Sequence, residues 1–265
     1  MNKNEYRVKA HNTATASENK IHDDGVARRF GFRGGLVPGV DVYAYLTHPL
    51  VERWGRAWLE RGSVAARFHK PVYDGEDVLV VARDAPEGSI EIEVRNPAGD
   101  LCAAARATLP EQTPAAPDVA AYPPGATPDE PPPASPESLV AGRILGSFEN
   151  GFHADRAGEY LADVRETLPI YGEERVAHPG YLLRNANWIL VANVKLGPWI
   201  HVGSEVQNFS AARDGERIAT RGRVQAAYEK KGHRFVDLDL VMLADATRPL
   251  LRVLHTAIYQ PRQAA

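Results

Sequence analysis

A block of about thirty residues occurs twice in this 265-residue chain, at an offset of 141 positions. The block keeps proline, glycine and tryptophan, which backbone geometry and bulk constrain, so a chance match is improbable. The matching pairs are Pro38-Gly39 with Pro179-Gly180, Trp58 with Trp199, Ser63 with Ser204 and Phe68 with Phe209. We therefore predict two copies of one fold within the chain.

A proline-rich segment separates the two copies. Residues 110–136 hold ten of the twenty prolines of the chain. Each proline removes a backbone donor and fixes φ, so this segment can form neither a sheet core nor a helix. We expect an extended surface linker between a first copy over residues 1–109 and a second copy over residues 137–265.

Each copy begins with a helical pattern and continues with strand patterns. In the first copy, apolar residues recur at a helical period over residues 40–61, and Pro49 is expected to kink or divide this helix. Strands are expected at residues 63–70, 78–82, 90–95 and 101–109. In the second copy, the helix is expected at residues 181–194 and the strands at residues 202–209, 218–228, 235–243 and 250–259. This order predicts an α+β unit whose antiparallel sheet wraps the helix.

The composition excludes several classes of function. A net charge of −3, a pI near 6.3 and the lack of a basic run give no support for nucleic-acid binding. Residues 1–6 are polar and charged, so no secretory signal is expected, and no stretch approaches the roughly 20 apolar residues of a membrane span. The single cysteine, Cys102, lies in an apolar run and is expected to be a buried thiol. We expect a cytoplasmic protein.

One polar run in the first copy carries the candidate chemistry. Residues 15–24 contain Ser17, Glu18, Asn19 and His22, and histidine is the side chain whose ordinary pKa lies nearest neutrality. At the offset of 141, the positions of Ser17, Asn19 and His22 hold Gly158, Tyr160 and Asp163. The second copy therefore lacks the polar set, which predicts one active centre per chain. The histidines lack metal-ligand spacing, so no metal site is expected.

These residues resemble a motif of the MaoC-like family of hot-dog-fold proteins, which includes (R)-specific enoyl-CoA hydratases and (3R)-hydroxyacyl dehydratases. The matching positions are Asn19, Ile21, His22, Asp24, Ala27, Gly31-Phe32 and Gly39, together with a strand and turn over residues 67–76. Through the repeat, the resemblance implies an α+β double hot dog. It also implies an acyl-thioester substrate on CoA or an acyl carrier protein, with no bound cofactor.

The resemblance makes His22 the acid/base group of a hydration or dehydration. The aspartate of the family motif falls on Ser17, which cannot act as a carboxylate. Two interpretations remain open. Either the adjacent Glu18 takes over this role, or Ser17 and Asn19 position a water for His22.

The start of the central helix supplies the second part of the expected site. The resemblance places backbone donors for the thioester oxygen at Gly39 and Val40, where free N–H groups and the helix dipole favour negative charge. Thr47 falls near a helix position that lines the site in related enzymes, and the Tyr43 hydroxyl could reach the pocket.

Three functions are compatible with this sequence. The first is a hydratase or dehydratase of enoyl or 3-hydroxyacyl thioesters. The second is a non-catalytic acyl-thioester-binding or partner subunit, because Ser17 replaces the aspartate. The third is a hot-dog thioesterase, which needs a carboxylate on the central helix, where the first half offers only Asp41. CoA phosphates could meet Arg33, Arg67 or Lys70, and a homodimer of double hot dogs is one assembly open to the chain.

Overall fold

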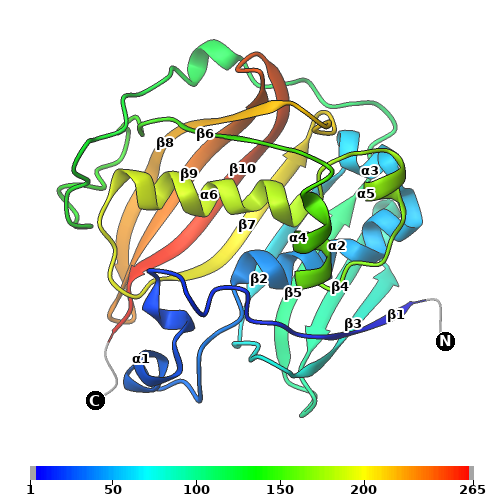
Figure 1. Ribbon diagram of the computed structural model, residues 1–265, viewed down its shortest axis with the longest axis horizontal. Helices are drawn as coiled ribbons and strands as arrows, with labels where there is room; N and C mark the ends of the chain where they lie inside the picture. The colour runs from blue at the N-terminus through cyan, green and yellow to red at the C-terminus, as the bar shows by residue number, and fades with distance from the viewer. Residues whose placement is uncertain (1–3, 263–265) are drawn as a thin grey trace.

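The computed structural model describes residues 4–262 (Figure 1). Within these residues, ten strands form one antiparallel sheet in the order β1-β3-β4-β5-β2-β7-β10-β9-β8-β6. The strands of the first copy occupy one half of this sheet and those of the second copy the other half. The predicted α+β architecture of two repeats is therefore confirmed.

The strands and helices have the following bounds. The strands are β1 (Glu5–Lys9), β2 (Ser63–Phe68), β3 (Asp77–Asp84), β4 (Ile90–Arg95), β5 (Leu101–Thr108), β6 (Phe148–Gly151), β7 (Ile200–Asn208), β8 (Arg217–Lys230), β9 (His233–Ala244) and β10 (Arg248–Gln260). The α-helices are α1 (Asp24–Arg29), α2 (Gly39–Trp54), α3 (Arg56–Arg61), α4 (Ala157–Asp163), α5 (Ile170–Glu173) and α6 (Pro179–Asn193). Short 3-10 helices lie at η1 (Lys20–His22), η2 (Pro86–Gly88) and η3 (Val119–Ala121).

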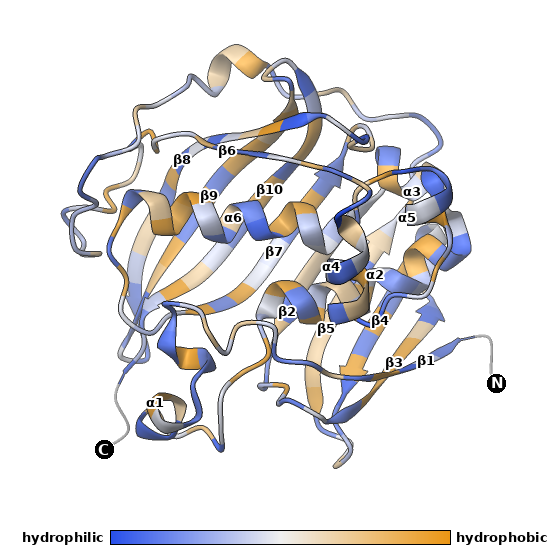
Figure 2. Ribbon diagram, viewed as in Figure 1, coloured by the Kyte–Doolittle hydropathy of each residue, from blue (hydrophilic) through white to orange (hydrophobic). Residues whose placement is uncertain are grey.

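The two copies join through neighbouring strands at the centre of the sheet. β2 pairs with β7 in an antiparallel register that sets Ser63 opposite Gln207 and Arg67 opposite Gly203. Hydrophobic and hydrophilic residues alternate along several of the strands, which gives the sheet one apolar face toward the helices (Figure 2). The central helices α2 and α6 lie on the same face of the sheet (Figure 1).

The helical segment of the first copy is divided later than expected. α2 continues through Pro49 and is separated from α3 at Gly55, whose φ of 55° lies in the left-handed region that glycine adopts readily. The expected division therefore lies six residues after the proline. Residues 40–48 are all buried, because the sheet covers one side of α2 and elements of the second copy, α6 among them, cover the other.

Two edge strands were absent from the sequence prediction. β1 pairs with β3 at one edge of the sheet, and β6 pairs with β8 at the other. Both are short, of five and four residues, so their period-2 patterns are too brief to be distinctive.

Cys102 is buried, as expected, and burial raises the pKa of its thiol. Among residues 4–262, no helix combines the length and the apolar character that crossing a membrane requires.

The proline-rich segment is bound to the sheet rather than free at the surface. It contains η3, and the Tyr122 hydroxyl after η3 donates to the carboxylate of Asp239 on β9, at 3.0 and 3.2 Å. Tyr122 packs with Val241 and Leu243 on the face of β9 opposite the main core. The buried carboxylate of Asp239 also accepts hydrogen bonds from Arg223 and Arg252, whose side chains reach the surface, so the tyrosine completes the hydrogen bonding of a buried carboxylate.

Replacing Tyr122 with phenylalanine should lower the free energy of unfolding by about 1.5–3 kcal/mol, the usual effect of removing a hydrogen bond to a charged group. Denaturation in urea, monitored by circular dichroism, measures this change. Tyr228→Phe is the matched control, because Tyr228 is 40% exposed and its expected change is within about 0.5 kcal/mol. Equal shifts in the two variants would mean that the Tyr122 bond does not stabilise the attachment of the linker.

Candidate active site

The environment of His22 fixes which ring nitrogen carries the proton. Its Nδ1 lies 2.6 Å from the carbonyl oxygen of Leu36. A carbonyl oxygen only accepts, so Nδ1 carries the hydrogen and donates it. Burial lowers the pKa of His22 below its usual 6.5, against opposing effects of the Leu36 bond and of Asp41. The ring is therefore neutral near pH 7, and its Nε2 is an unprotonated nitrogen that can accept a proton.

Asn19 links the loop that bears His22 to the second copy. Its side-chain amide donates to the carbonyl oxygen of Trp199 at 3.0 Å and accepts from the N–H of Trp199 at 3.2 Å. The same Nδ2 lies 3.3 Å from Nε2 of His22, and its Oδ1 caps η1 through the N–H of Ile21. Because these bonds use both ends of the amide, Asn19 holds the loop that bears His22 against the second copy.

His22 lies between two adjoining spaces that both copies form. The first, the inner cavity, has a volume of about 220 Å³ and is mostly apolar, with Phe68 and Val72 from the first copy and Ile200 from the second. The second, the outer groove, has a volume of about 640 Å³. The outer groove includes Ser17, Glu18, Arg184, Trp188 and Lys195, and both spaces include Asn19, His22, Pro38, Asn187 and Trp199.

The start of α2 presents unpaired backbone donors to these spaces. The N–H groups of Asp41 and Val42 bond to the carbonyl of Pro38. Those of Gly39 and Val40 have no acceptor within residues 4–262. Gly39 lines the inner cavity and Val40 the outer groove, so each of the two expected donor residues lines a space that His22 also lines.

The other predicted site residues lie further from the inner cavity. Ser17 lines only the outer groove, and its hydroxyl donates to the carbonyl of Asn19 at 3.2 Å. Glu18 is exposed at the outer groove. Tyr43 and Thr47 are buried in the core and line neither space, and Thr47 donates its hydroxyl hydrogen bond to the carbonyl of Ala44. Both face the packing between α2 and its neighbours instead of the pocket.

Two polar residues of the second copy were missed in the sequence. Asn187 on α6 lines both spaces, and its Oδ1 is buried without a hydrogen-bond partner in the described chain. His201 on β7 lines the inner cavity. Each is directly flanked by apolar residues in the sequence, and neither lies at a position equivalent to the His22 motif. A polar residue inside an apolar helix or strand was the available signal.

In the second copy, side chains fill the space that corresponds to the inner cavity. Tyr160, at the position equivalent to Asn19, is buried, and a Cβ at Gly180 would overlap its hydroxyl. His178, which precedes this helix start, accepts from the N–H of Gly180 through Nδ1 at 3.0 Å. Its Nε2 faces a carboxylate oxygen of Glu166 at 3.3 Å. These groups pair with one another within the core.

The basic residues first considered for CoA phosphates are all paired with carboxylates. The pairs are Arg33 with Glu76, Arg67 with Glu205 and Lys70 with Asp100. A different groove holds Lys195, Arg234 and Arg262 beside one carboxylate, Glu229. This basic groove adjoins the outer groove, because Lys195 and Gly197 line both.

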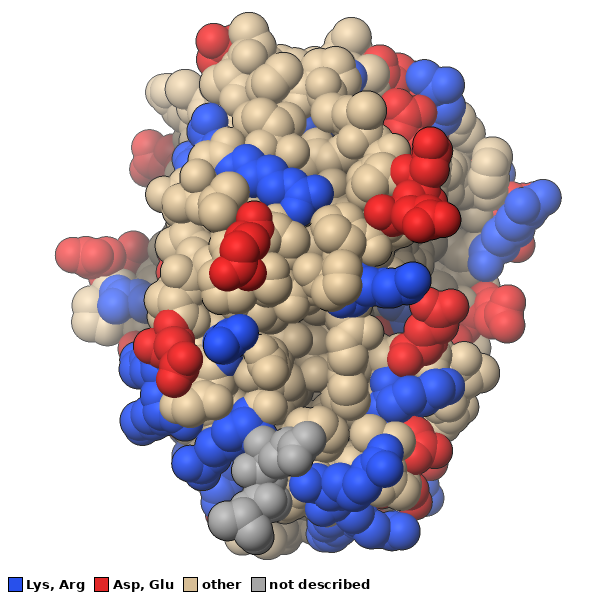
Figure 3. All heavy atoms as spheres, turned by 90° about the vertical axis from the view of Figure 1, so that its left-hand side faces the viewer, with Lys and Arg blue, Asp and Glu red and all other residues tan. Residues whose placement is uncertain are grey.

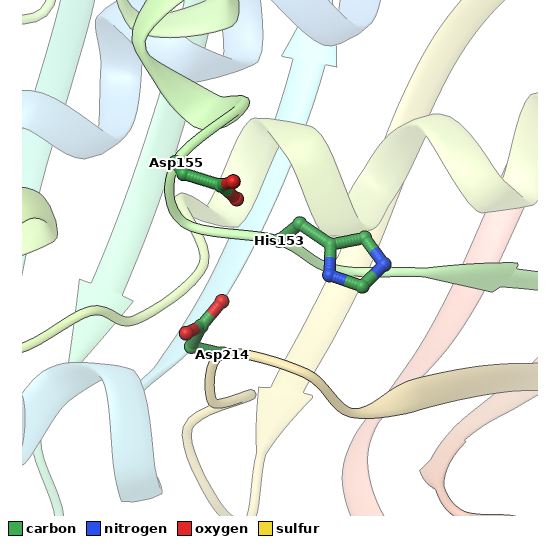
Figure 4. Close-up of side chains that lie close together, drawn as sticks. All are labelled: His153, Asp155 and Asp214. Carbon is green, nitrogen blue, oxygen red and sulfur yellow. The ribbon is translucent and has the colours of Figure 1, made fainter.

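One cluster within the described residues has ligand types suited to a metal. His153 and Asp155 before α4 lie near Asp214 in the turn before β8, with potential ligand atoms within 4.8 Å of one another (Figure 4). Asp214 already accepts from Arg175 and from the N–H of Ala154. The cluster lines neither the inner cavity nor the outer groove. It therefore contributes nothing to the site around His22.

Comparison with solved structures relates this geometry to known folds. A MaoC-like dehydratase is 12% identical, with 97% of this chain and 98% of that chain covered and a TM-score of 0.63. A Mycobacterium tuberculosis protein described as having a double hot-dog fold is 14% identical, with 96% of each chain covered and a TM-score of 0.62. A protein assigned as a thioesterase, from Novosphingobium aromaticivorans, is 13% identical, with 98% and 97% covered and a TM-score of 0.55.

Comparisons of sequence give no match. No protein-family model matches the chain, and no curated protein sequence is significantly similar to it. At identities of 12–14%, the structural matches establish the fold alone. The chain has the double hot-dog fold, which it shares with MaoC-like dehydratases over almost its whole length.

Proposed function

We propose that this protein is a hydratase or dehydratase of α,β-unsaturated or 3-hydroxyacyl thioesters, with His22 as its acid/base. One observation carries the proposal. His22, whose Nε2 is unprotonated, lines the mostly apolar inner cavity together with Gly39 and the outer groove together with Val40, and the N–H groups of Gly39 and Val40 are free within residues 4–262. A base and an oxyanion site next to an apolar cavity are the parts that addition of water to an enoyl thioester requires.

In the hydration direction, Nε2 of His22 takes a proton from water as the water oxygen bonds to the β-carbon. The double bond shifts, and negative charge develops on the thioester oxygen, where the N–H groups of Gly39 and Val40 stabilise it. The imidazolium of His22 then returns its proton to the α-carbon, which restores the neutral ring. Dehydration is the same sequence in reverse.

The adjoining spaces support a CoA thioester as the substrate. The inner cavity, at about 220 Å³, has room for roughly seven groups of water size, ~30 Å³ each, which suits a short or medium acyl chain. The outer groove suits the pantetheine arm, and a thioester bound in this way would lie beside His22. The basic groove with Lys195, Arg234 and Arg262 suits the phosphates. Lys and Arg side chains gather at the lower end of the face in Figure 3, near the C-terminal end of the described chain.

The environment of Asp41 argues against the thioesterase alternative. Its two carboxylate oxygens accept from Thr13 at 2.6 Å and from Arg184 at 2.9 Å, and the residue is fully buried. Asp41 lines neither the inner cavity nor the outer groove. The helix carboxylate that would activate water for thioester hydrolysis is thus bonded elsewhere.

Incubation with trans-2-hexenoyl-CoA tests the proposal through loss of the enoyl absorbance. The rate constant kcat/KM should rise with pH through an apparent pKa below 6.5 and stay constant above it, because only neutral His22 can accept the proton. Release of free thiol would instead identify a thioesterase. Binding of the thioester without turnover, across short, medium and aromatic acyl chains, would identify a non-catalytic subunit.

A further inference from the structure

A chain of three buried polar side chains ends at the inner cavity. Nε2 of His201 on β7 lies 2.9 Å from the hydroxyl of Ser204, which in turn lies 3.0 Å from Nδ1 of His255 on β10. The two imidazole rings stack with centroids 4.2 Å apart. Ser204 and His255 are fully buried, and only His201 lines the cavity.

The surroundings of His201 determine its tautomer. Nε2 also lies 3.2 Å from the carbonyl oxygen of Gly203, which can only accept. Nε2 therefore carries the hydrogen, and the Ser204 hydroxyl donates onward to His255. Burial lowers the pKa of His201 well below its usual value, with a smaller contribution from His255, so the ring stays neutral. Its Nδ1 is left as an unprotonated acceptor.

This Nδ1 has no hydrogen-bond partner among residues 4–262, although His201 is only 5% exposed. A buried acceptor without a donor is unfavourable, and native proteins rarely keep one without a reason. The neighbouring residue, a glycine, has no side chain that would crowd this buried atom. A Cβ at Gly39 would lie 2.8 Å from Nδ1 and would cover it. The acceptor, the glycine and the free N–H of that glycine thus share one corner of the inner cavity.

We propose that Nδ1 of His201 accepts a hydrogen bond from an O–H group of the bound ligand. This assignment rests on the function proposed above: the O–H group is the 3-hydroxyl of a hydroxyacyl thioester. Its oxygen is the one that water supplies in the hydration direction. His201 binds and orients this oxygen, while His22 transfers the proton. The inner cavity is thereby selective for a hydroxylated acyl chain over an unsubstituted chain of equal length.

Calorimetric titration with (R)-3-hydroxyhexanoyl-CoA and hexanoyl-CoA tests this selectivity. Hexanoyl-CoA has no hydroxyl group to eliminate, so the enzyme cannot turn it over. The wild type should bind the hydroxylated thioester about tenfold more tightly, the usual effect of one satisfied buried hydrogen bond. His201→Gln keeps a polar group toward Ser204 but removes the cavity acceptor, so the preference should disappear. His201→Asn places its amide oxygen near the Nδ1 position and should retain most of the preference.

A second variant keeps the test independent of how His201 variants fold. The methyl group of Gly39→Ala would cover Nδ1 and should also abolish the preference, with circular dichroism confirming the fold. Equal affinity of the wild type for both thioesters would overturn the proposal, as would an unchanged preference in His201→Gln.

Failure of the proposed function has a different result. If the wild type binds neither thioester, the proposed function fails, and ethyl 3-hydroxyhexanoate and ethyl hexanoate then probe the cavity directly by ligand-observed NMR. Preferential binding of the hydroxylated ester that is lost in His201→Gln supports the acceptor role of His201. Equal binding of the two esters, or binding of neither, overturns it.

Discussion

Replacing His22 with asparagine is expected to lower kcat for hydration of an enoyl thioester by about 100- to 10,000-fold, the usual contribution of one acid/base group. The asparagine amide can still donate to the carbonyl of Leu36, so the bond that orients the loop is conserved. The variant has no counterpart of Nε2 and cannot accept the proton of water. Initial rates with trans-2-hexenoyl-CoA, together with the melting temperature, separate loss of chemistry from loss of fold.

Two controls define this experiment. His153→Asn changes an exposed histidine outside the inner cavity and outer groove, and its rate should equal that of the wild type. Glu18→Gln tests whether the adjacent carboxylate replaces the missing aspartate. Because Glu18 is exposed and does not line the inner cavity, little change in rate is expected. A His22→Asn enzyme at nearly full rate would transfer the acid/base role to another group, and a large loss in Glu18→Gln would identify that group.

Replacing Glu166 with alanine should lower the free energy of unfolding by about 3–5 kcal/mol, as expected when one partner of a buried charge network is removed. One carboxylate oxygen of Glu166 accepts from Nδ1 of His48 at 2.8 Å and from the N–H groups of Thr167 and Leu168. The other faces His178. His48 lies on α2 and His178 precedes α6, so this side chain connects the two copies.

The pH dependence of stability provides a second measurement for Glu166. Burial alone would raise its pKa, but its bonds to His178 and His48 hold the pKa far below the usual 4.5. The ionised carboxylate therefore stabilises the fold above about pH 4.5, and this contribution is lost as the pH falls below that value. Burial lowers the pKa of His178, so the unfolded chain takes up its proton first and stability also falls below pH 6.5.

Urea denaturation of wild type and Glu166→Ala between pH 3 and 7 tests the effect of the Glu166 charge. The difference between the two proteins should shrink as the pH falls below about 4.5. Glu91→Ala is the matched control, because Glu91 is exposed on β4 and should change the free energy by at most about 0.5 kcal/mol. A constant difference at every pH would mean that packing, and not the charge of Glu166, dominates its effect.

Long periodic segments of this chain could be predicted because their burial follows from local pattern. The helices around Tyr43 and Leu183 and the strands on either side of Asp74-Gly75 show this. The position of the helix break could not be predicted from the sequence, because the geometry at Gly55 depends on how α3 packs against β7. The linker was predicted from its prolines, whereas its attachment through Tyr122 depends on a partner 117 residues away.

The residues of the candidate site also fall into those that the sequence could predict and those that it could not. His22 and the helix start at Gly39 belong to one local motif, so the motif was enough to select both as candidates, whereas the bond from His22 to Leu36 came from the structure. Asn187 and His201 reach the inner cavity only because β2 and β7 pair across the centre of the sheet. Their contribution depends on contacts between segments far apart in sequence, which no local pattern encodes.

Tyr160 fills the space in the second copy that corresponds to the inner cavity, and this affects how the sequences of the two copies can diverge. Two identical subunits must carry two identical hollows, so any residue that closes one hollow closes both. A covalent tandem removes this symmetry, and an aromatic ring can stabilise one half while the other half stays open. The second copy can then supply side chains such as His201 to the cavity across the β2–β7 boundary. Neither copy alone contains the whole pocket.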